Sequence, residues 1–409
     1  MEFFTKLFKK NSICFVTIVL YMIHGCIILA RYNYPRFWNS MNSYVLAHYL
    51  ISYQQYGLIP RGLIGTGFHY LLQFFSASQI FMLILGLTCG IYCLFLMYML
   101  YIIRKKNYPE ILILLFLLFL ANPLSWLSFF ELGRFDIYLL LLTMTAGVIL
   151  FHAPPWTRFL IPFLIPIGVM IHEAFLFLFV PVIWSWSFLQ VRQKQLKSAI
   201  LPGIMLLSIF FSVLLLMTMR QNMPSGTTIH AHLASASPIF PWIEKIEYDY
   251  AGNRDSVLTY KDHFLCVWNW LCNDGNFYAM LLSLLFWALL VYCPMYFLSL
   301  LLVQQKDRLG KLQIFFLMAA GIAPLSLMII GVDYGRWMAA SFWCLILTVF
   351  FLYQEREPRF TEPVFIRRKE IVFLIIVCSL AMGESKTWYF NHFTMIFGQK
   401  INSLIQILM

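Results

Sequence analysis

The sequence predicts an all-α polytopic integral membrane protein, and three observations lead to that class. Of its 409 residues, 61% are hydrophobic and only 11% are charged, which is more apolar surface than a water-soluble core can bury. Many apolar stretches have a length close to that of a helix that crosses the hydrocarbon core, which is about 20 residues. They lack the polar and apolar alternation of an outer-membrane barrel. We therefore expect residues 1–409 to form a single membrane domain.

The basic residues indicate how the chain is oriented. The formal net charge is +11, and Lys and Arg gather before the first apolar stretch and in short loops at residues 104–106, 306–311 and 356–369. Short basic loops face the cytoplasm, so we expect a cytoplasmic N-terminus. The chain has no soluble basic domain, and we expect no nucleic-acid partner.

The expected elements alternate between the two faces of the membrane. Residues 12–30 form a first span, and residues 32–77 form a first outer loop. Within this loop, residues 63–75 are too short to span and are expected to form an interfacial or re-entrant helix after Pro60. Spans follow at residues 80–103, 109–130 and 137–152.

The orientation of the later loops depends on residues 159–190. A single helix of this length would extend about 48 Å, against about 30 Å of hydrocarbon. A single crossing would also place the basic loops at 306–311 and 356–369 outside. We therefore expect a short hairpin with His172 and Glu173 at an outward-facing tip.

The rest of the chain follows from that choice. A span at 198–219 leads to a large extracytoplasmic loop at residues 220–275. Further spans are expected at 277–303, 312–331, 338–353 and 371–382, while residues 394–409 are short and interrupted. The prediction is eleven or twelve transmembrane helices, with the C-terminus left unplaced.

A charged motif occurs twice between apolar stretches. Residues 131–136 read ELGRFD and residues 333–337 read DYGRW, and each copy follows a Pro-Leu-Ser. Ionisable groups at membrane depth cost roughly 2.5–3.5 kcal/mol each, so they indicate a functional site. Glu131 with Arg134, and Asp333 with Arg336, are three residues apart, so each pair could instead be a local ion pair or a helix cap.

The predicted topology brings ionisable side chains from several segments to the outer side. They are Arg36, Arg61, Glu131, Arg134, Asp136, His172, Glu173, Asp333 and Arg336. Arginines bind phosphate and diphosphate through forked hydrogen bonds, and a partly desolvated carboxylate can act as a general base toward a hydroxyl. Transfer of a group from a lipid-linked phosphate to an acceptor hydroxyl would use both.

Several local alternatives stay open. Asp136 begins an expected helix and could cap it, and a single interior histidine such as His172 often has only a structural role. No Lys or Arg lies near Glu173 in the sequence, which favours a chemical role for that carboxylate. Arg61 follows a turn, where it could bind a lipid phosphate or extend to the headgroups.

Metal binding is not indicated. His230 and His232 could face one way on a strand, but no third ligand is evident. Cys266 and Cys272 lie in the large loop and could pair, although nothing in their spacing requires it. We therefore expect no cofactor.

The chain resembles the GT-C-like superfamily of glycosyltransferases in its size, its number of helices, its outward Arg and acidic residues and its large exported loop. These enzymes use polyprenyl-linked sugars, and by size the chain resembles the O-antigen or capsule repeat-unit polymerases of the Wzy type. The resemblance implies surface polysaccharide biosynthesis at the outer face of a bacterial inner membrane, with a polyprenyl-linked saccharide, membrane lipids and other polysaccharide-assembly proteins as partners. Many of these enzymes carry an acidic residue in the first outer loop, whereas residues 32–62 have none.

The resemblance also implies roles for particular residues. Arg61, Arg134 and Arg336 would bind the lipid phosphate, and Asp136 or Glu173 would activate the acceptor. The remaining three, Glu131, Asp333 and His172, would support them.

A transporter or flippase of lipid-linked oligosaccharide is the alternative. The repeated motif favours it, because transporters are often built from internal repeats. The expected cytoplasmic charges all fall in short loops rather than along a path through the membrane, which favours the enzyme. An outward acyl or phosphoethanolamine transferase ranks lower, because no nucleophile motif is evident.

Overall fold

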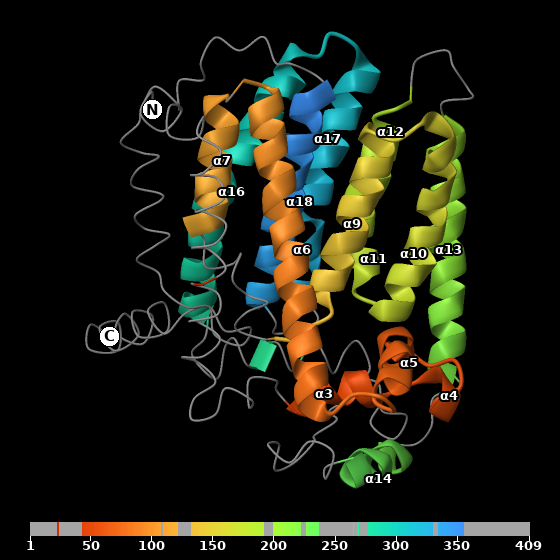
Figure 1. Ribbon diagram of the computed structural model, residues 1–409. Coiled ribbons are helices and arrows are strands. Elements are labelled where there is room, and N and C mark those ends of the chain that lie inside the picture. The colour runs from red at the N-terminus through yellow and green to blue at the C-terminus, as the bar shows by residue number, and fades with distance from the viewer. Residues whose placement is uncertain are drawn as a thin grey trace. The chain divides into compact units, whose positions relative to one another are not determined.

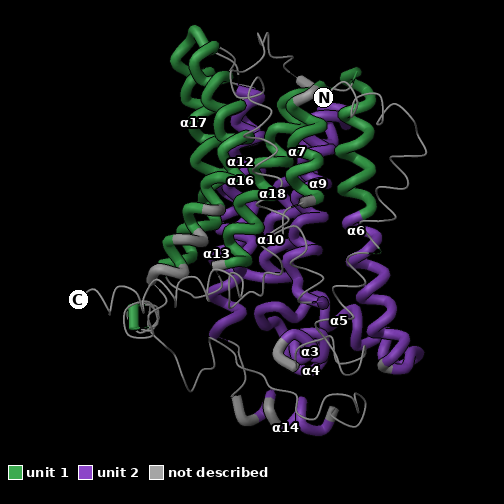
Figure 2. Tube along the Cα trace, turned by 90° about the vertical axis from the view of Figure 1, so that its left-hand side faces the viewer, with its two compact units in different colours: residues 1–25, 93–130, 262–409 green, residues 26–92, 131–261 purple. Residues whose placement is uncertain are grey.

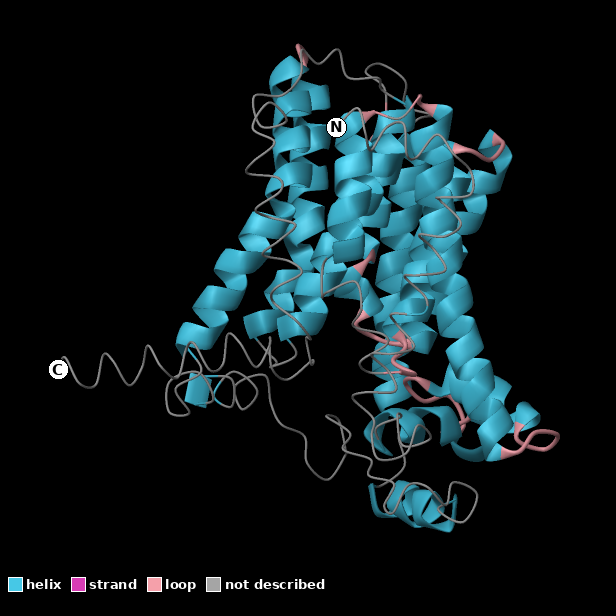
Figure 3. Cartoon of the chain, turned by 60° about the vertical axis from the view of Figure 1, so that its left-hand side comes forward, coloured by secondary structure: helices cyan, strands magenta, loops and turns pink. Residues whose placement is uncertain are grey.

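The protein is all-α over the residues that the structure describes. The computed structural model describes residues 43–107, 109–121, 132–191, 199–221, 226–236, 277–329 and 334–355, together with residues 23, 265, 268 and 269. These residues form helices joined by loops, with no strand among them (Figure 3). The spans predicted at 12–30, apart from residue 23, and at 371–382, and the segment 394–409, lie outside this part of the chain.

Five helices in the described ranges are long and apolar enough to cross a membrane. They are α6 (Ala77–Lys105), α13 (Ile200–Gln221), α16 (Phe277–Gln304), α17 (Arg308–Ile322) continued by the 3-10 helix η6 (Ala323–Ile329), and α18 (Tyr334–Glu355). Each overlaps a span expected from the sequence. Such a set of helices suits a multi-pass membrane protein.

The chain divides into two compact units (Figure 2). Unit 1 comprises residues 1–25, 93–130 and 262–409, and unit 2 comprises residues 26–92 and 131–261. In unit 1, α18 packs against α16, α17 and η6, and α16 also contacts α7 (Glu110–Ala121). Gly321 allows α17 and α18 to approach closely, because a Cβ at this position would lie 2.3 Å from the Leu345 side chain.

Unit 2 is built around four helices that lie side by side (Figure 1). They are α9 (Asp136–Phe151), α10 (Ile161–Ile171), α12 (Val180–Phe188) and α13. The 3-10 helix η3 (Pro155–Leu160) connects α9 to α10. Both α10 and α12 pack against α9 and α13.

The chain reverses direction between α10 and α12. Helix α10 ends at Ile171, His172 is extended, and the short helix α11 (Phe175–Leu178) leads into α12. Gly168 makes room for the reversal, because a Cβ there would lie 2.1 Å from the Phe175 ring. The reversal agrees with the hairpin that the length of residues 159–190 predicts, with His172 and Glu173 at its tip. The side of a membrane that this tip faces stays a prediction.

Three short helices lie across the tip end of this bundle (Figure 1). They are α3 (Ser43–Leu50), α4 (Tyr53–Tyr56) and α5 (Gly62–Leu71). The prediction of a single helix over residues 63–75 was incomplete, because α3 and α4 are too short to give a periodic apolar signal. Helix α5 packs directly on the end of α3, since a Cβ at Gly65 would lie 1.7 Å from the carbonyl oxygen of Ile51.

The described part of the large loop also differs from expectation. His230 and His232 lie in helix α14 (Gly226–Ala236), not on a strand. Positions two apart on a helix face about 200° apart, so the two histidines do not form the half-site that a strand would allow. His232 instead packs edge-on against the Tyr56 ring of α4, with the ring centroids 5.7 Å apart.

Candidate functional site

An ion pair between Arg61 and Glu173 joins the first outer segment to the hairpin tip. Arg61 Nε donates hydrogen bonds to Glu173 Oε1 at 3.1 Å and Oε2 at 3.0 Å, and Arg61 Nη2 also contacts Oε1. The side chains are 11% and 19% exposed, respectively. A forked, largely buried pair of this kind is much stronger than an ordinary surface salt bridge.

Local backbone geometry places both partners. Arg61 precedes α5 in the left-handed conformation, with φ 61° and ψ 7°, which is unusual for a residue other than glycine. Glu173 follows the last turn of α10, and α10 packs against α5. The contact between these helices therefore brings together two residues that are 112 positions apart.

His48 on α3 is a second partner of Arg61. Its Nε2 lies 2.8 Å from Arg61 Nη1. A guanidinium group only donates hydrogen bonds, so His48 Nε2 must accept, and the ring is neutral with its proton on Nδ1. The Phe135 ring meets His48 edge-on, with the centroids 5.9 Å apart, and limits the ring's movement.

His172 has two neighbours that compete for one ring nitrogen. The backbone N–H of Ala174 donates to His172 Nδ1 at 3.1 Å, while Glu173 Oε2 lies 3.4 Å from the same atom. Accepting from Ala174 requires Nδ1 to be unprotonated, whereas an ion pair with Glu173 would require a proton there. His172 is therefore a neighbouring group with which Glu173 could exchange a proton.

The charges around Glu173 favour its ionised form. Burial alone would raise the pKa of this carboxyl, but the charge of Arg61, a contribution from His172 and the hydrogen bonds from Arg61 outweigh burial and hold the pKa well below its usual range. While the pair with Arg61 is intact, Glu173 is a carboxylate of low basicity.

The segment 132–136 packs beside this cluster. The Tyr49 hydroxyl of α3 donates to the Gly133 carbonyl at 2.7 Å and lies 3.1 Å from the Tyr138 hydroxyl. Phe135 packs edge-on against Tyr49 as well as His48. Gly133 has φ 93°, which a side chain would disfavour. The motif thus contributes an aromatic ring and a backbone carbonyl to the surroundings of Arg61.

The predicted site residues differ in where the structure places them. Arg61, His172 and Glu173 form one cluster with His48, which we call the Arg61 cluster. Arg134 and Asp136 are buried in the same unit. Arg336 is buried at the start of α18 in unit 1. The other predicted members, Arg36, Glu131 and Asp333, lie outside the described residues.

Two interpretations from the sequence require correction. The ground on which the sequence favoured Glu173, that no Lys or Arg lies nearby, does not hold in the fold, because Arg61 pairs with Glu173 from another segment. Asp136 is the first residue of α9 rather than its N-cap, which is Phe135. His48 was not predicted from the sequence, because its only signal is an imidazole in a short, mostly apolar stretch.

No metal site is present among the described residues, where no three His, Cys, Asp or Glu side chains are grouped as ligands. The two cysteines of the large loop, Cys266 and Cys272, lie outside them.

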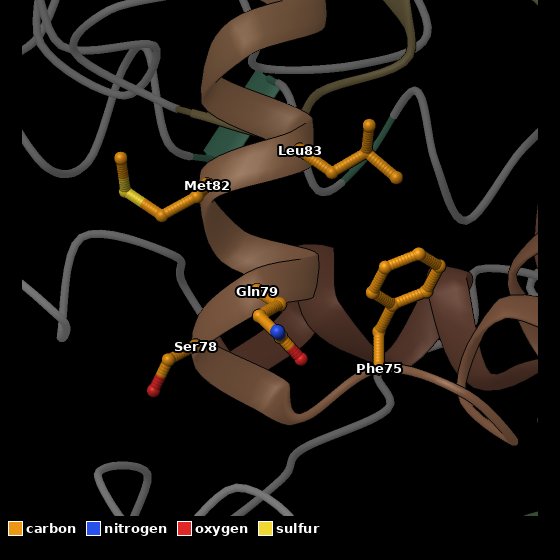
Figure 4. Close-up of a pocket in the computed structure, with 5 residues that line it drawn as sticks. All are labelled: Phe75, Ser78, Gln79, Met82 and Leu83. Carbon is orange, nitrogen blue, oxygen red and sulfur yellow. The ribbon is translucent and has the colours of Figure 1, made fainter.

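A pocket of about 440 Å³ lies beside the first turns of α6. It is lined by Phe75, Ser78, Gln79, Met82 and Leu83 (Figure 4). In this view Ser78 and Met82 project to one side of the helix and Phe75 lies on the other. None of these five side chains is ionisable, so the pocket offers no general acid or base.

Comparisons with protein-family models, with curated proteins and with solved structures gave no match to this chain.

Proposed function

We propose that the chain transfers a saccharide from a polyprenyl phosphate or diphosphate carrier to an acceptor hydroxyl. The supporting observation is the Arg61 cluster, in which an arginine, a carboxylate and two histidines meet within one unit. The arginine suits a phosphate and the carboxylate suits the activation of a hydroxyl. Asp136, buried at the start of α9, is the second candidate for the base.

The proposed reaction needs these groups in defined roles. The acceptor oxygen attacks the anomeric carbon, the bond from that carbon to the carrier's phosphate oxygen breaks, and the hydroxyl proton passes to the Glu173 carboxylate. The carrier leaves with the additional negative charge, which Arg61 stabilises. His172, 3.4 Å from Glu173 Oε2, is placed to take up the proton afterwards.

The backbone of Arg61 supports a functional role. A residue other than glycine in the left-handed conformation costs about 1–2 kcal/mol, and such strain concentrates at functional sites. At residue 61 that conformation is combined with a buried, charged side chain. Local stability alone would favour a glycine or an asparagine at this position.

The finer features of the fold and location belong to the same proposal. We propose a GT-C-like arrangement of eleven or twelve transmembrane helices in a bacterial inner membrane, with the hairpin tip at the extracytoplasmic face. The enzyme would act in the biosynthesis of O-antigen or capsule, as a repeat-unit polymerase or a related transferase. Arg134, which lies in the same unit as Arg61, would be a further ligand of the carrier phosphate, and a phosphate-binding role for Arg336 stays a prediction from the sequence.

A flippase for lipid-linked oligosaccharide is the second candidate, and one observation favours it. The two copies of the charged motif fall in different units, each next to the start of an apolar helix. Arg134 and Arg336 are buried to a similar degree, at 9% and 8% exposed. A motif repeated in two units is the pattern from which many transporters are built.

Turnover in detergent distinguishes the two candidates. The purified protein would be given a lipid-linked saccharide and an acceptor, and the released carrier and the extended saccharide would be quantified. We expect Glu173→Gln to lower turnover about 10²- to 10⁴-fold, the usual contribution of a general base. Asp307→Asn is the matched control, because it makes the same change of charge at the N-cap of α17 in unit 1 and asparagine also caps helices.

Two results would count against the transferase. If the wild-type protein gives no turnover in detergent but moves the lipid-linked saccharide across vesicles, the flippase is correct. If wild-type turnover is measurable and Glu173→Gln leaves it unchanged, Glu173 is not the base.

A further inference from the structure

The guanidinium of Arg61 is already engaged by protein groups on the side that would bind an anion. Nε and Nη2 form the edge that best fits two oxygens of a carboxylate or phosphate. Both atoms contact the Glu173 carboxylate, and Nη1 contacts His48. A phosphate cannot take this edge of Arg61 while Glu173 keeps its position.

The position of Glu173 resembles that of a bound ligand. Its two oxygens lie where two phosphate oxygens would lie on the Arg61 edge. The residue is in a turn at the end of α10 rather than within a helix, so rotation of its side chain does not require α10 to move. The Ala174 N–H that holds His172 comes from the next residue in the same turn.

We propose that Arg61 is a self-occupied phosphate site, in which Glu173 takes the place of the phosphate and a phosphomonoester or diphosphate displaces it. The proposal rests on the proposed function and deepens it, because it identifies how the carrier's phosphate enters the site. A diphosphate that links a polyprenol to a sugar carries two negative charges against one on a carboxylate, so it competes effectively for the same edge.

Displacement also explains when Glu173 becomes a base. Paired with Arg61, the carboxylate has a low proton affinity. Once a phosphate takes Arg61, Glu173 loses its strongest counter-charge and gains an anionic neighbour, and both changes raise its affinity for a proton. Glu173 thus becomes basic only after the carrier has bound, and His172, whose Nδ1 lies 3.4 Å from Glu173 Oε2, is the neighbouring group for onward transfer of the proton.

The proposal predicts that removing the carboxylate tightens phosphate binding. We would measure the dissociation constant of pyrophosphate and, separately, of farnesyl diphosphate in detergent micelles, by calorimetric titration of the purified full-length protein. Glu173→Gln keeps the shape of the side chain but removes the competing charge, and we expect at least a tenfold lower dissociation constant. Arg61→Met should abolish binding, and Asp307→Asn, with the same charge change elsewhere, should match the wild type.

A second variant guards against misfolding of the first. Glu173→Asp keeps the charge but is one methylene shorter, so it pairs less well with Arg61 and should bind pyrophosphate with intermediate affinity. A thermal-shift readout adds a further check, because pyrophosphate should stabilise Glu173→Gln more than it stabilises the wild type.

The outcomes separate this inference from the proposed function. Equal or weaker binding by Glu173→Gln and Glu173→Asp than by the wild type would overturn the self-occupied site, even if the wild type transfers saccharide. Tighter binding by the variants, with no turnover by the wild type, would support the anion site and overturn the transferase. If Glu173→Gln lowers the dissociation constants of both probes, the site recognises the phosphate groups alone. If it lowers only that of farnesyl diphosphate, the site recognises the phosphate as a lipid headgroup, with the isoprenoid chain attached.

Discussion

A measurement of the energetic coupling between Arg61 and Glu173 tests the structure most directly. We would compare the wild type with Arg61→Met, with Glu173→Gln and with the variant carrying both changes. Removing one partner leaves the other group buried without its counterpart, because the side chains are 11% and 19% exposed. Breaking a fully buried pair destabilises a protein by about 3–5 kcal/mol, and we expect a smaller loss for this pair because both side chains are partly exposed.

The coupling energy can be estimated from the same geometry. Two unit charges about 4 Å apart attract by about 4 kcal/mol at an effective dielectric constant of about 20. Part of this is offset by desolvation, so we expect the double variant to be more stable than the sum of the single effects by about 2–3 kcal/mol. Methionine retains a Cβ, so the left-handed strain at residue 61 is present in every variant and cancels.

The assay is unfolding in mixed SDS micelles, followed by tryptophan fluorescence and analysed as a double-mutant cycle. Circular dichroism of each variant before unfolding checks that its helices are intact. If the double variant is destabilised by the full sum of the single effects, the two side chains do not interact. The forked hydrogen bonds between Arg61 and Glu173 would then be wrong, and so would the self-occupied phosphate site.

Three further predictions follow from individual contacts. In the same unfolding assay, Gly65→Ala should destabilise the protein by about 2–3 kcal/mol, because its Cβ would lie 1.7 Å from a backbone oxygen. Gly67→Ala is the control and should be neutral or slightly stabilising, because a Cβ there would have nothing within 4 Å. Tyr49→Phe should cost about 1–3 kcal/mol of stability, because it leaves the buried Gly133 carbonyl without its donor. Tyr56→Phe should cost almost nothing, because its hydroxyl has no hydrogen-bond partner within the described structure. Equal losses would contradict the hydrogen bond from Tyr49 to Gly133. The pKa of Glu173 is held below its unfolded value of about 4.3, so its stabilising effect is present above that pH and is lost as the pH falls through the folded pKa. The stability difference between wild type and Glu173→Gln should therefore not fall between pH 8 and pH 5, and a decline within this range would show that the pKa is not depressed.

Much of the helical framework could be predicted from the sequence, because it depends on composition and length. The long helices α6, α13, α16 and α18 each fall within a few residues of an expected span. The hairpin followed from the mismatch between 32 residues of apolar chain and the thickness of a membrane. These signals are local and accumulate over many residues.

The candidate site was only partly predictable, for physical reasons. Arg61, His172 and Glu173 were identified individually, because charge is costly in an apolar chain. Their pairing depends on the contact between α5 and α10, which brings together residues 112 positions apart and leaves no local pattern. His48 was missed because α3 is only eight residues long and its single imidazole looks like part of an apolar stretch.

The combination of strain and buried charge at residue 61 argues that the pair with Glu173 is not there for stability alone. Replacing a buried ion pair by apolar groups is often neutral or stabilising, and a glycine would relieve the left-handed backbone. We therefore expect the double variant Arg61→Met with Glu173→Leu to be less stable than the wild type in the SDS assay by no more than about 1–3 kcal/mol, the cost of leaving His48 Nε2 without its donor. The same protein should bind no pyrophosphate and transfer no saccharide. A double variant that is far less stable than the wild type would mean that the pair is a structural link between α5 and the hairpin tip.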